Sequence, residues 1–399
     1  MRLASCETFV VGTPPPHLGG RYFLFVKLTT TAGVVGYGEV YAATFGPAVI
    51  EQAVHDVAER HLIGHEVSDI EAMWRRVYGS GYTLRPDPTL VGVLSGLEIA
   101  CWDIVGKELD RPVYRLLGGR VHERLRGYTY LYPRAGDTTD VYTDPDLAAT
   151  RAAEAVAAGF TAVKFDPAGP YTVYDGHQPS LDDLDRSEAM VAAVREAVGP
   201  QADILFGTHG QFSPSGAIRL ARRIERYEPL WFEEPIPPGD PAAMATVARA
   251  TSIPIATGER LTTVTEFGAL IEHRAVGFVQ PNLGRCGGIL AAKKIAALAE
   301  AGGVHLAPHL YCGPVVGAAN IQVSTCSPNF AVLEGIGDWG GFHAELLRTP
   351  VRFESGAVIP PEAPGIGVEV DEDVARAHPY HDGGTADDLH LRMHPDPVR

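Results

Sequence analysis

The chain is short of cysteine and of positive charge, and it has no long hydrophobic run. Its 399 residues include only five cysteines, none of them in a C-x-x-C motif. We therefore expect reduced thiols and a cytoplasmic protein. No apolar stretch reaches the roughly 18 residues of a membrane-spanning helix, and the first ten residues lack the pattern of a secretory signal. These absences predict that the protein has no membrane partner.

Basic residues are outnumbered by acidic ones. The chain has 33 Lys and Arg residues against 49 Asp and Glu residues, which gives a formal net charge of -16. A phosphate backbone would be repelled at long range, so we expect no nucleic-acid partner. Anionic small molecules are not excluded, because a buried cation can reverse the local field. Hydrophobic residues make up 45% of the chain, which is typical of a globular protein.

The first 120 residues read as strands followed by helices. Alternation of polar and apolar residues predicts three strands: Glu7–Val11, Phe23–Thr29 and Val34–Val40. Apolar residues at helical spacing cover Ser95–Leu109, and the pair Gly118 and Gly119 is a stop signal. Residues 1–120 are therefore predicted to form an N-terminal α+β unit.

After residue 120, short apolar strands alternate with helices. The eight expected strands are Gly127–Tyr132, Ala162–Phe165, Ile204–Phe206, Leu230–Phe232, Ile253–Ala256, Gly277–Val279, His305–Ala307 and Phe330–Leu333. Eight such units predict an α/β fold, a (β/α)8 or modified TIM barrel, over residues 121–350. A doubly wound open sheet is the alternative, although no GxGxxG motif follows the first strand. Residues 351–399 are expected to return to the N-terminal capping domain and to end in a His- and Asp-rich tail.

Polar side chains stand where nearly every predicted strand ends. They are Lys164, Asp166, His209, Glu233, Glu259, Arg260, Asn282, His309 and Glu334. Any one of them is compatible with an ordinary surface position. In a parallel barrel, however, the carboxyl ends of the strands converge on one mouth, where catalytic groups sit. The sequence therefore predicts an anionic site that needs a cation.

Two carboxylates and two histidines have the chemistry of an active site. Glu233 and Glu259 lie on adjacent predicted strands, and carboxylate oxygens are the ligands that Mg²⁺ prefers. The alternative is a pair of rim acids bonded to Arg260 or to lysines. His209 and His309 lie on opposite sides of the barrel, and imidazoles in such positions suit acid–base work near neutral pH.

Several longer motifs carry a family resemblance. They are SGLEIACWDIVGKELDRPVYRLLGG, WFEEP, the GE of ATGER, QPNLGRCGG and LAPH. Together they resemble the enolase superfamily, mandelate-racemase subgroup, and within it the galactonate and mannonate dehydratase branch. The resemblance covers nearly the whole chain. It implies a Mg²⁺-dependent acid-sugar dehydratase that forms 2-keto-3-deoxy sugar acids, and we also expect a homo-oligomer.

The resemblance also implies roles for individual residues. The metal ligands fall on Glu233 and Glu259, and the two catalytic histidines on His209 and His309. The Glu that bonds or polarises the substrate carboxylate falls on Glu334.

Two departures from the pattern matter. Gly207 stands where the branch has an Asp as first metal ligand, and Asn282 where the family Asp supports the strand-seven histidine. Asp166 replaces the second Lys of the family's Lys-x-Lys motif, but dehydratases of this branch also lack that Lys. Three outcomes stay open for the metal: Asp166 reaches across as a ligand, the ion keeps fewer protein ligands and more water, or no ion binds. Asn282 offers no negative charge, so we expect His309 to be less basic than an Asp-supported histidine.

The N-terminal domain of this family closes over the mouth. The loop Thr13–Tyr22 is therefore expected to supply substrate contacts from His17 and Arg21, although a plain Pro- and Gly-rich loop is the alternative. Asn282 and Arg260 are predicted to complete the substrate-binding set.

The predicted reaction removes the proton alpha to a carboxylate and then the beta hydroxyl. His309 is the preferred base and His209 the preferred acid, with the roles open to reversal; Lys164 is expected near the carboxylate or as the alternate base. The alternatives are an epimerase or cycloisomerase that uses the same enediolate, and a non-catalytic descendant that binds a sugar acid or a protein partner. The sequence does not name the sugar acid or its stereochemistry.

Overall fold

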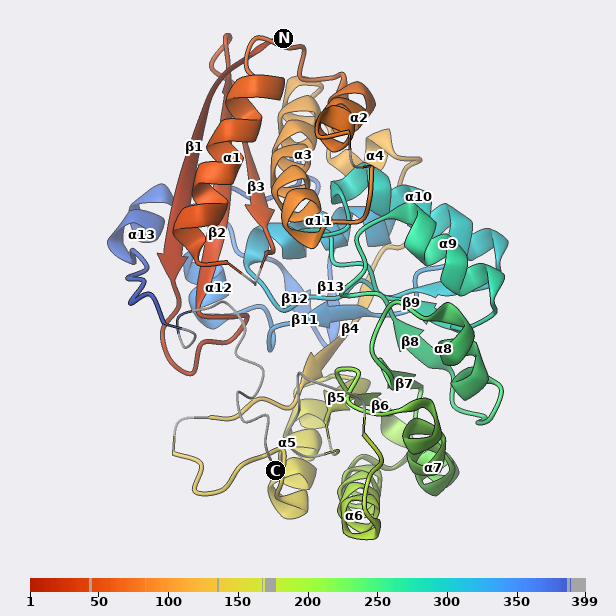
Figure 1. Ribbon diagram of the computed structural model, residues 1–399. Helices are drawn as coiled ribbons and strands as arrows, with labels where there is room; N and C mark the ends of the chain where they lie inside the picture. Colours follow the sequence, from red (N-terminus) through yellow and green to blue (C-terminus); the bar gives the residue numbers. More distant parts are fainter. Residues whose placement is uncertain are drawn as a thin grey trace.

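A three-stranded antiparallel sheet and a layer of helices form the N-terminal unit, which stands above the barrel in Figure 1. The computed structural model describes residues 1–42, 45–82, 84–134, 136–166, 168, 177–385 and 388. The strands are β1 Leu3–Gly12, β2 Tyr22–Thr30 and β3 Val35–Val40, and the helices are α1 Pro47–His61, α2 Ile70–Ser80, α3 Pro88–Glu108 and α4 Val113–Leu116. All three strands predicted from the sequence are confirmed.

Helix α3 lies directly on β3. A Cβ atom at Gly38 would come within 1.8 Å of the carbonyl oxygen of Gly96, so this contact requires glycine. The helix starts seven residues before the predicted Ser95, because the Asp87 side chain accepts hydrogen bonds from the N–H groups of Thr89 and Leu90 and caps it there. In length and composition α3 would pass for a membrane span, but 78% of its most apolar window is buried inside the protein. That burial is the mark of a core helix.

Eight parallel strands close into a barrel. They are β4 Leu125–Tyr130, β5 Ala162–Phe165, β6 Asp203–Gly207, β7 Trp231–Glu233, β8 Ile255–Thr257, β9 Phe278–Val279, β10 His305–Leu306 and β11 Leu333–Gly335. Neighbours pair in chain order from β4 to β10, and β11 pairs with β4. An isolated parallel bridge joins Leu306 of β10 to Phe330, which lies three residues before β11. The predicted barrel is confirmed, and the open-sheet alternative is wrong because the sheet closes on itself.

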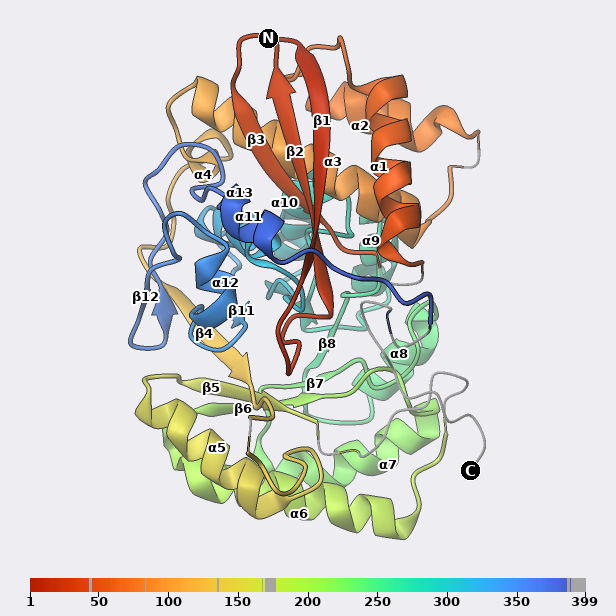
Figure 2. The ribbon, with the colours of Figure 1, turned by 90° about the vertical axis from the view of Figure 1, so that its left-hand side faces the viewer.

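Helices separate the strands and cover the outside of the barrel (Figures 1 and 2). They are α5 Pro145–Ala157, α6 Leu181–Val198, α7 Pro214–Ile224, α8 Pro241–Ala248, α9 Val264–Glu272, α10 Gly288–Ala301 and α11 Pro314–Thr325. Two short 3-10 helices, Gly199–Gln201 and Glu225–Tyr227, follow α6 and α7. Helix α7 is capped at its start, since the Ser213 hydroxyl accepts from the N–H of Gly216.

The C-terminal segment touches both units. It contains α12 Gly341–Glu345, β12 Phe353–Glu354, β13 Ala357–Val358 and α13 Glu372–Ala377. Strand β13 pairs with the start of β4, whereas Tyr380 N–H donates to the Val10 carbonyl of β1. Figure 2 shows α13 lying against the N-terminal sheet. Most of the predicted tail, residues 386, 387 and 389–399, lies outside the described residues.

Buried acids of the N-terminal unit hold the starts of two barrel helices. Glu98 accepts from the N–H groups of Ile289 and Leu290 at α10. Glu39 does the same with Gly313 and Val316 at α11. These helix starts offer unpaired N–H groups and positive dipole ends, which suit a carboxyl group.

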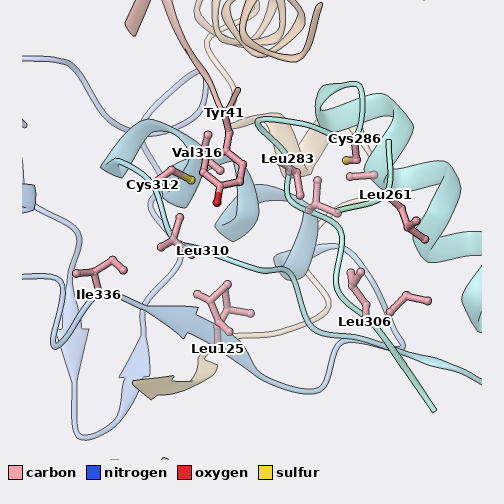
Figure 3. Packing of buried hydrophobic residues seen from close by; sticks show 14 of the residues in the cluster. Tyr41, Leu125, Leu261, Leu283, Cys286, Leu306, Leu310, Cys312, Val316 and Ile336 are labelled. Carbon is pink, nitrogen blue, oxygen red and sulfur yellow. The ribbon is translucent and has the colours of Figure 1, made fainter. Parts of the chain in front are cut away.

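Apolar packing adds to this joint between the two units. Figure 3 shows Tyr41, which follows β3, reaching into the cluster around Leu310, Cys312 and Val316. The N-terminal unit is thus fixed to the barrel by hydrogen bonds and by packing.

Candidate active site

The ammonium group of Lys164 lies at the centre of the candidate site. The side chain comes from β5 and is 2% exposed. Its Nζ atom lies 2.5 Å from Glu233 Oε1 and 3.3 Å from Glu334 Oε1. Burial alone lowers the pKa of Lys164, but the two carboxylates outweigh it and hold the pKa above the ordinary value. Lys164 is therefore a fixed cation, which does not favour its predicted part as an alternate base.

Both carboxylates beside Lys164 are also bound on their second oxygen. Glu233 Oε2 accepts from Trp231 Nε1 at 3.0 Å and from Gln280 Nε2 at 2.8 Å. Glu334 Oε2 accepts from the N–H of Leu310 at 2.8 Å. Sequence reasoning gave neither Trp231 nor Gln280 a role in the site. The sequence could have indicated the contact of Trp231, because this residue precedes Glu233 by two positions on β7 and therefore points to the same face.

His209 and Asp166 form a pair at the ends of β6 and β5. Nδ1 of His209 lies 3.6 Å from Oδ2 of Asp166, and Oδ1 of Asp166 accepts from the N–H of Ala168 at 2.9 Å. Burial lowers the pKa of His209, but Asp166 and Glu259 outweigh it, so the pKa is raised. Nδ1 of His209 thus faces a carboxylate.

His309 is held differently. Its Nδ1 lies 2.9 Å from Asn282 Nδ2, and its Nε2 lies 3.3 Å from Glu259 Oε2. The ring is 4% exposed, and burial lowers the pKa of His309 to about 4. Asn282 was predicted to bind substrate. Its amide NH2 group instead donates to the His309 ring, and its amide oxygen accepts from the N–H of Gly284. It positions the histidine.

Glu234 and Arg260 form a further pair beside these groups. Arg260 Nη2 lies 2.7 Å from Glu234 Oε2. Glu234 is 1% exposed, and burial raises the pKa of its carboxyl to about 7. The predicted substrate residue Arg260 thus already has a carboxylate partner, which sequence reasoning had not assigned to it.

The carboxylates have the right chemistry for Mg²⁺ but not the arrangement. Over the described part of the chain, no three His, Cys, Asp or Glu side chains are grouped so that they could hold one ion. Asp166, Glu233 and Glu259, the predicted ligands, each face a lysine or a histidine instead. The first family ligand is absent at Gly207. The residues present therefore do not fit an ion that has three protein ligands, and the part of Asp166 as a compensating ligand stays a prediction.

The loop after β1 approaches the barrel. A Cβ atom at Gly19 would lie 2.9 Å from the carbonyl oxygen of Cys312, just after β10. Within the loop, His17 Nδ1 hydrogen-bonds to the Thr13 carbonyl at 2.9 Å, and the Arg21 carbonyl accepts from Thr13 N–H. The loop is thus beside the strand ends, and substrate contacts of His17 and Arg21 stay predictions.

A cavity of about 760 Å³ lies elsewhere in the molecule. It is between α11 and the C-terminal segment and is lined by Arg120, Lys107 and residues 359–364 and 366–369, among others. None of the strand-end groups described above lines it. We assign the active site by the convergence of charged groups at the strand ends, where barrel enzymes carry their chemistry.

A closed parallel barrel that carries charged side chains at the ends of its strands is typical of barrel enzymes. Residues 147–374 match the family model "Enolase C-terminal domain-like", and residues 17–118 match "Mandelate racemase / muconate lactonizing enzyme, N-terminal domain". The chain belongs to the mandelate racemase/muconate lactonizing enzyme family of the enolase superfamily. Members of this superfamily typically use a divalent metal ion.

Relatives with assigned activities are moderately similar. A D-gluconate dehydratase of Thermoproteus tenax is 35% identical over 354 residues, which is 88% of this chain and 69% of that protein. A D-galactonate dehydratase of Ralstonia pickettii (strain 12J) is 35% identical over 358 residues, 88% of this chain and 89% of that protein.

A solved structure is more similar. The protein of Labrenzia alexandrii DFL-11, which bears the same family description, is 61% identical and superposes with a TM-score of 0.96 over 98% of this chain and 100% of that chain.

Proposed function

We propose that the protein is an acid-sugar dehydratase, a hydro-lyase that converts a sugar acid to a 2-keto-3-deoxy sugar acid. The relatives named gluconate and galactonate dehydratases support the class of substrate. The observation that carries the proposal is the different support of the two histidines: a carboxylate lies behind His209, and an amide lies behind His309. These neighbours give the two histidines different basicity, which suits an elimination that needs one base and one hydrogen-bond donor.

Lys164 is proposed to bind the substrate carboxylate. An ammonium group has three N–H donors, and two of those of Lys164 point to Glu233 and Glu334. The third is then donated to the substrate. A fixed positive charge at this place also stabilises the negative charge that develops on the carboxylate when the alpha proton leaves.

His209 is proposed as the base. The Asp166 carboxylate, 3.6 Å from Nδ1, stabilises the imidazolium by its charge, and Nε2 is proposed to take the alpha proton of the substrate. This reverses the preferred assignment from the sequence, which made His309 the base. The reason is that Nδ1 of His309 accepts a hydrogen bond from Asn282, so the ring proton is on Nε2, which then donates and does not accept.

The elimination balances with these two side chains. The bond from the alpha carbon to hydrogen breaks and the proton moves to His209 Nε2. The bond from the beta carbon to oxygen breaks next, with His309 donating a hydrogen bond from Nε2 to the departing oxygen. His209 then gives its proton to the departing oxygen, which leaves as water, and the enol tautomerises to the 2-keto acid.

Mg²⁺ stays a prediction from the family resemblance and takes no part in the steps above. Glu233 and Glu259 are the carboxylates that would hold the ion, and an ion there would act as a Lewis acid toward the substrate carboxylate. In the present arrangement both would first have to leave Lys164 and His309. Cytoplasmic location and homo-oligomer formation likewise stay predictions.

The test is a screen of sugar acids with a semicarbazide assay for 2-keto acids, followed by mass spectrometry of any product. We expect a 2-keto acid whose mass is that of the substrate less one water. The variant His209→Asn should lose this activity, whereas the exposed His273→Asn, a matched control on the outside of the barrel, should keep it. A product of unchanged mass would indicate the epimerase alternative, and ligand binding without any product would indicate the non-catalytic one.

A further inference from the structure

Lys164 occupies space that a side chain at residue 207 would need. A Cβ atom at Gly207 would lie 3.0 Å from Cε of Lys164 and 3.5 Å from the hydroxyl of Tyr130. With a side chain at that position, the end of the lysine would have to shift by a few tenths of an ångström. Gly207 therefore has two consequences. It removes a metal ligand of the branch pattern, and it leaves room for the buried lysine.

The ammonium group of Lys164 lies between two carboxylates. It touches Glu233 on β7 and Glu334 on β11, on opposite sides of β5 in the barrel wall. Nζ lies over the rings of Tyr128 and Tyr130, whose centroids are 5.9 and 5.4 Å away. Aromatic faces stabilise a cation through their quadrupoles. The pocket around Nζ is thus built for positive charge.

Other acids at the strand ends also have partners within this chain. Glu234 pairs with Arg260, and Glu259 faces the neutral ring of His309. A divalent ion held by Glu233 and Glu259 would have to break the contacts of these two acids with Lys164 and His309. The contact between Lys164 and Glu233 is a buried ion pair, and separating such a pair leaves an uncompensated charge and is strongly unfavourable.

We propose that the Lys164 ammonium group, seated in the room left by Gly207, takes the place of the divalent ion in this chain and makes the site independent of metal. The class of ligand it takes is a carboxylate, which receives the third N–H of Lys164. The catalytic part of this inference rests on the proposed function, whereas the metal part does not, because it is a statement about binding without substrate.

The experiment measures metal binding directly. Wild-type protein, freed of metal by a chelator, is titrated with Mn²⁺ and the free ion is followed by electron paramagnetic resonance. We expect no stoichiometric site up to about 1 mM Mn²⁺, a concentration that would reveal any site worth about 4 kcal/mol or more. Lys164→Met should instead bind one Mn²⁺ at least about tenfold more tightly than wild type, since Glu233 and Glu334 lose their cation. Addition of MgCl2 should raise the Tm of Lys164→Met but not that of wild type.

The control is Lys294→Met, which removes an exposed lysine paired with Glu71 and should behave as wild type. One Mn²⁺ bound by wild type, and lost in Glu259→Gln, would overturn the proposal. So would the absence of binding in a folded Lys164→Met, because the pocket would then not be a cation site. If Lys164→Met does not fold, the Mn²⁺ titration of the wild-type protein alone decides whether the proposal holds.

Activity is a separate readout. If a sugar-acid substrate is found, turnover of wild type should be unchanged after the chelator treatment. If no substrate is found, the proposed function fails while the Mn²⁺ result still stands on its own.

Discussion

The side-chain amide of Asn282 donates a hydrogen bond to Nδ1 of His309 across 2.9 Å. The orientation of the amide is fixed, because its oxygen accepts from the N–H of Gly284. Nδ1 must therefore be unprotonated, and the neutral ring carries its proton on Nε2 toward Glu259. An Asp at residue 282 would favour the opposite tautomer and the imidazolium. One amide in place of a carboxylate thus changes which nitrogen of the histidine takes part in chemistry.

Asn282→Asp is predicted to raise the pKa of His309 from its value of about 4. The new carboxylate accepts the Nδ1 proton and stabilises the charged ring, and it can still accept from Gly284. A neighbouring opposite charge shifts a pKa by about 1–3 units. The shift is measured by NMR titration of the imidazole, with His309→Gln identifying the resonance. An unchanged or lower pKa would contradict the hydrogen-bond assignment.

The two histidines are predicted to separate the steps of the reaction. His309→Asn should still exchange the alpha proton of the substrate with solvent deuterium while dehydration falls by about 100-fold or more. His209→Asn should lose both, because the base is gone. Exchange is followed by NMR and dehydration by the 2-keto acid assay. Exchange that survives in His209→Asn and disappears in His309→Asn would restore the assignment made from the sequence.

Glu98 is predicted to make stability fall as the pH rises. Burial raises the pKa of its carboxyl from 4.5 to about 8, so the folded chain holds this proton more tightly than the unfolded chain. The resulting stabilisation is complete below pH 4.5 and is lost as the pH approaches 8. Thermal unfolding at several pH values should show a shallower fall of Tm for Glu98→Gln, which resembles the protonated carboxyl.

The matched control for this experiment is Glu108→Gln, an exposed acid on the same helix. It should keep the wild-type dependence of Tm on pH. Equal slopes for wild type and Glu98→Gln would mean that Glu98 does not carry the effect.

Most of the fold could be predicted because the barrel strands are short apolar runs between helices with clear caps. The strand predicted at Ala162–Phe165 agrees with β5 at both ends. The last strand is the least accurate: Phe330–Leu333 was predicted, and β11 is Leu333–Gly335. The apolar run there serves two purposes, since Phe330 bridges to Leu306 before the chain pairs with β4. Hydrophobicity marks such a run but does not say which residues form the ladder.

The candidate site could be predicted in position but not in its contacts. Period two and the parallel barrel place Lys164 and Glu233 at one mouth, as the sequence indicated. Which atom each side chain touches depends on rotamers and on neighbours from distant strands, such as Gln280 on Glu233. The proximity of Lys164 to residue 207 is also a matter of packing. A motif compared position by position marks Gly207 as a missing ligand and does not reveal what fills the space.

The buried acids that join the N-terminal unit to α10 and α11 bear on how a substrate reaches the strand ends. Lifting that unit as a rigid lid would strip Glu39 and Glu98 of their N–H partners and expose the apolar surface around Tyr41. The loop at residues 13–21 carries no such anchor of buried carboxyl groups, and it borders the barrel at Cys312. Entry and exit are therefore least costly through movement of this loop alone, with the two units staying joined throughout turnover.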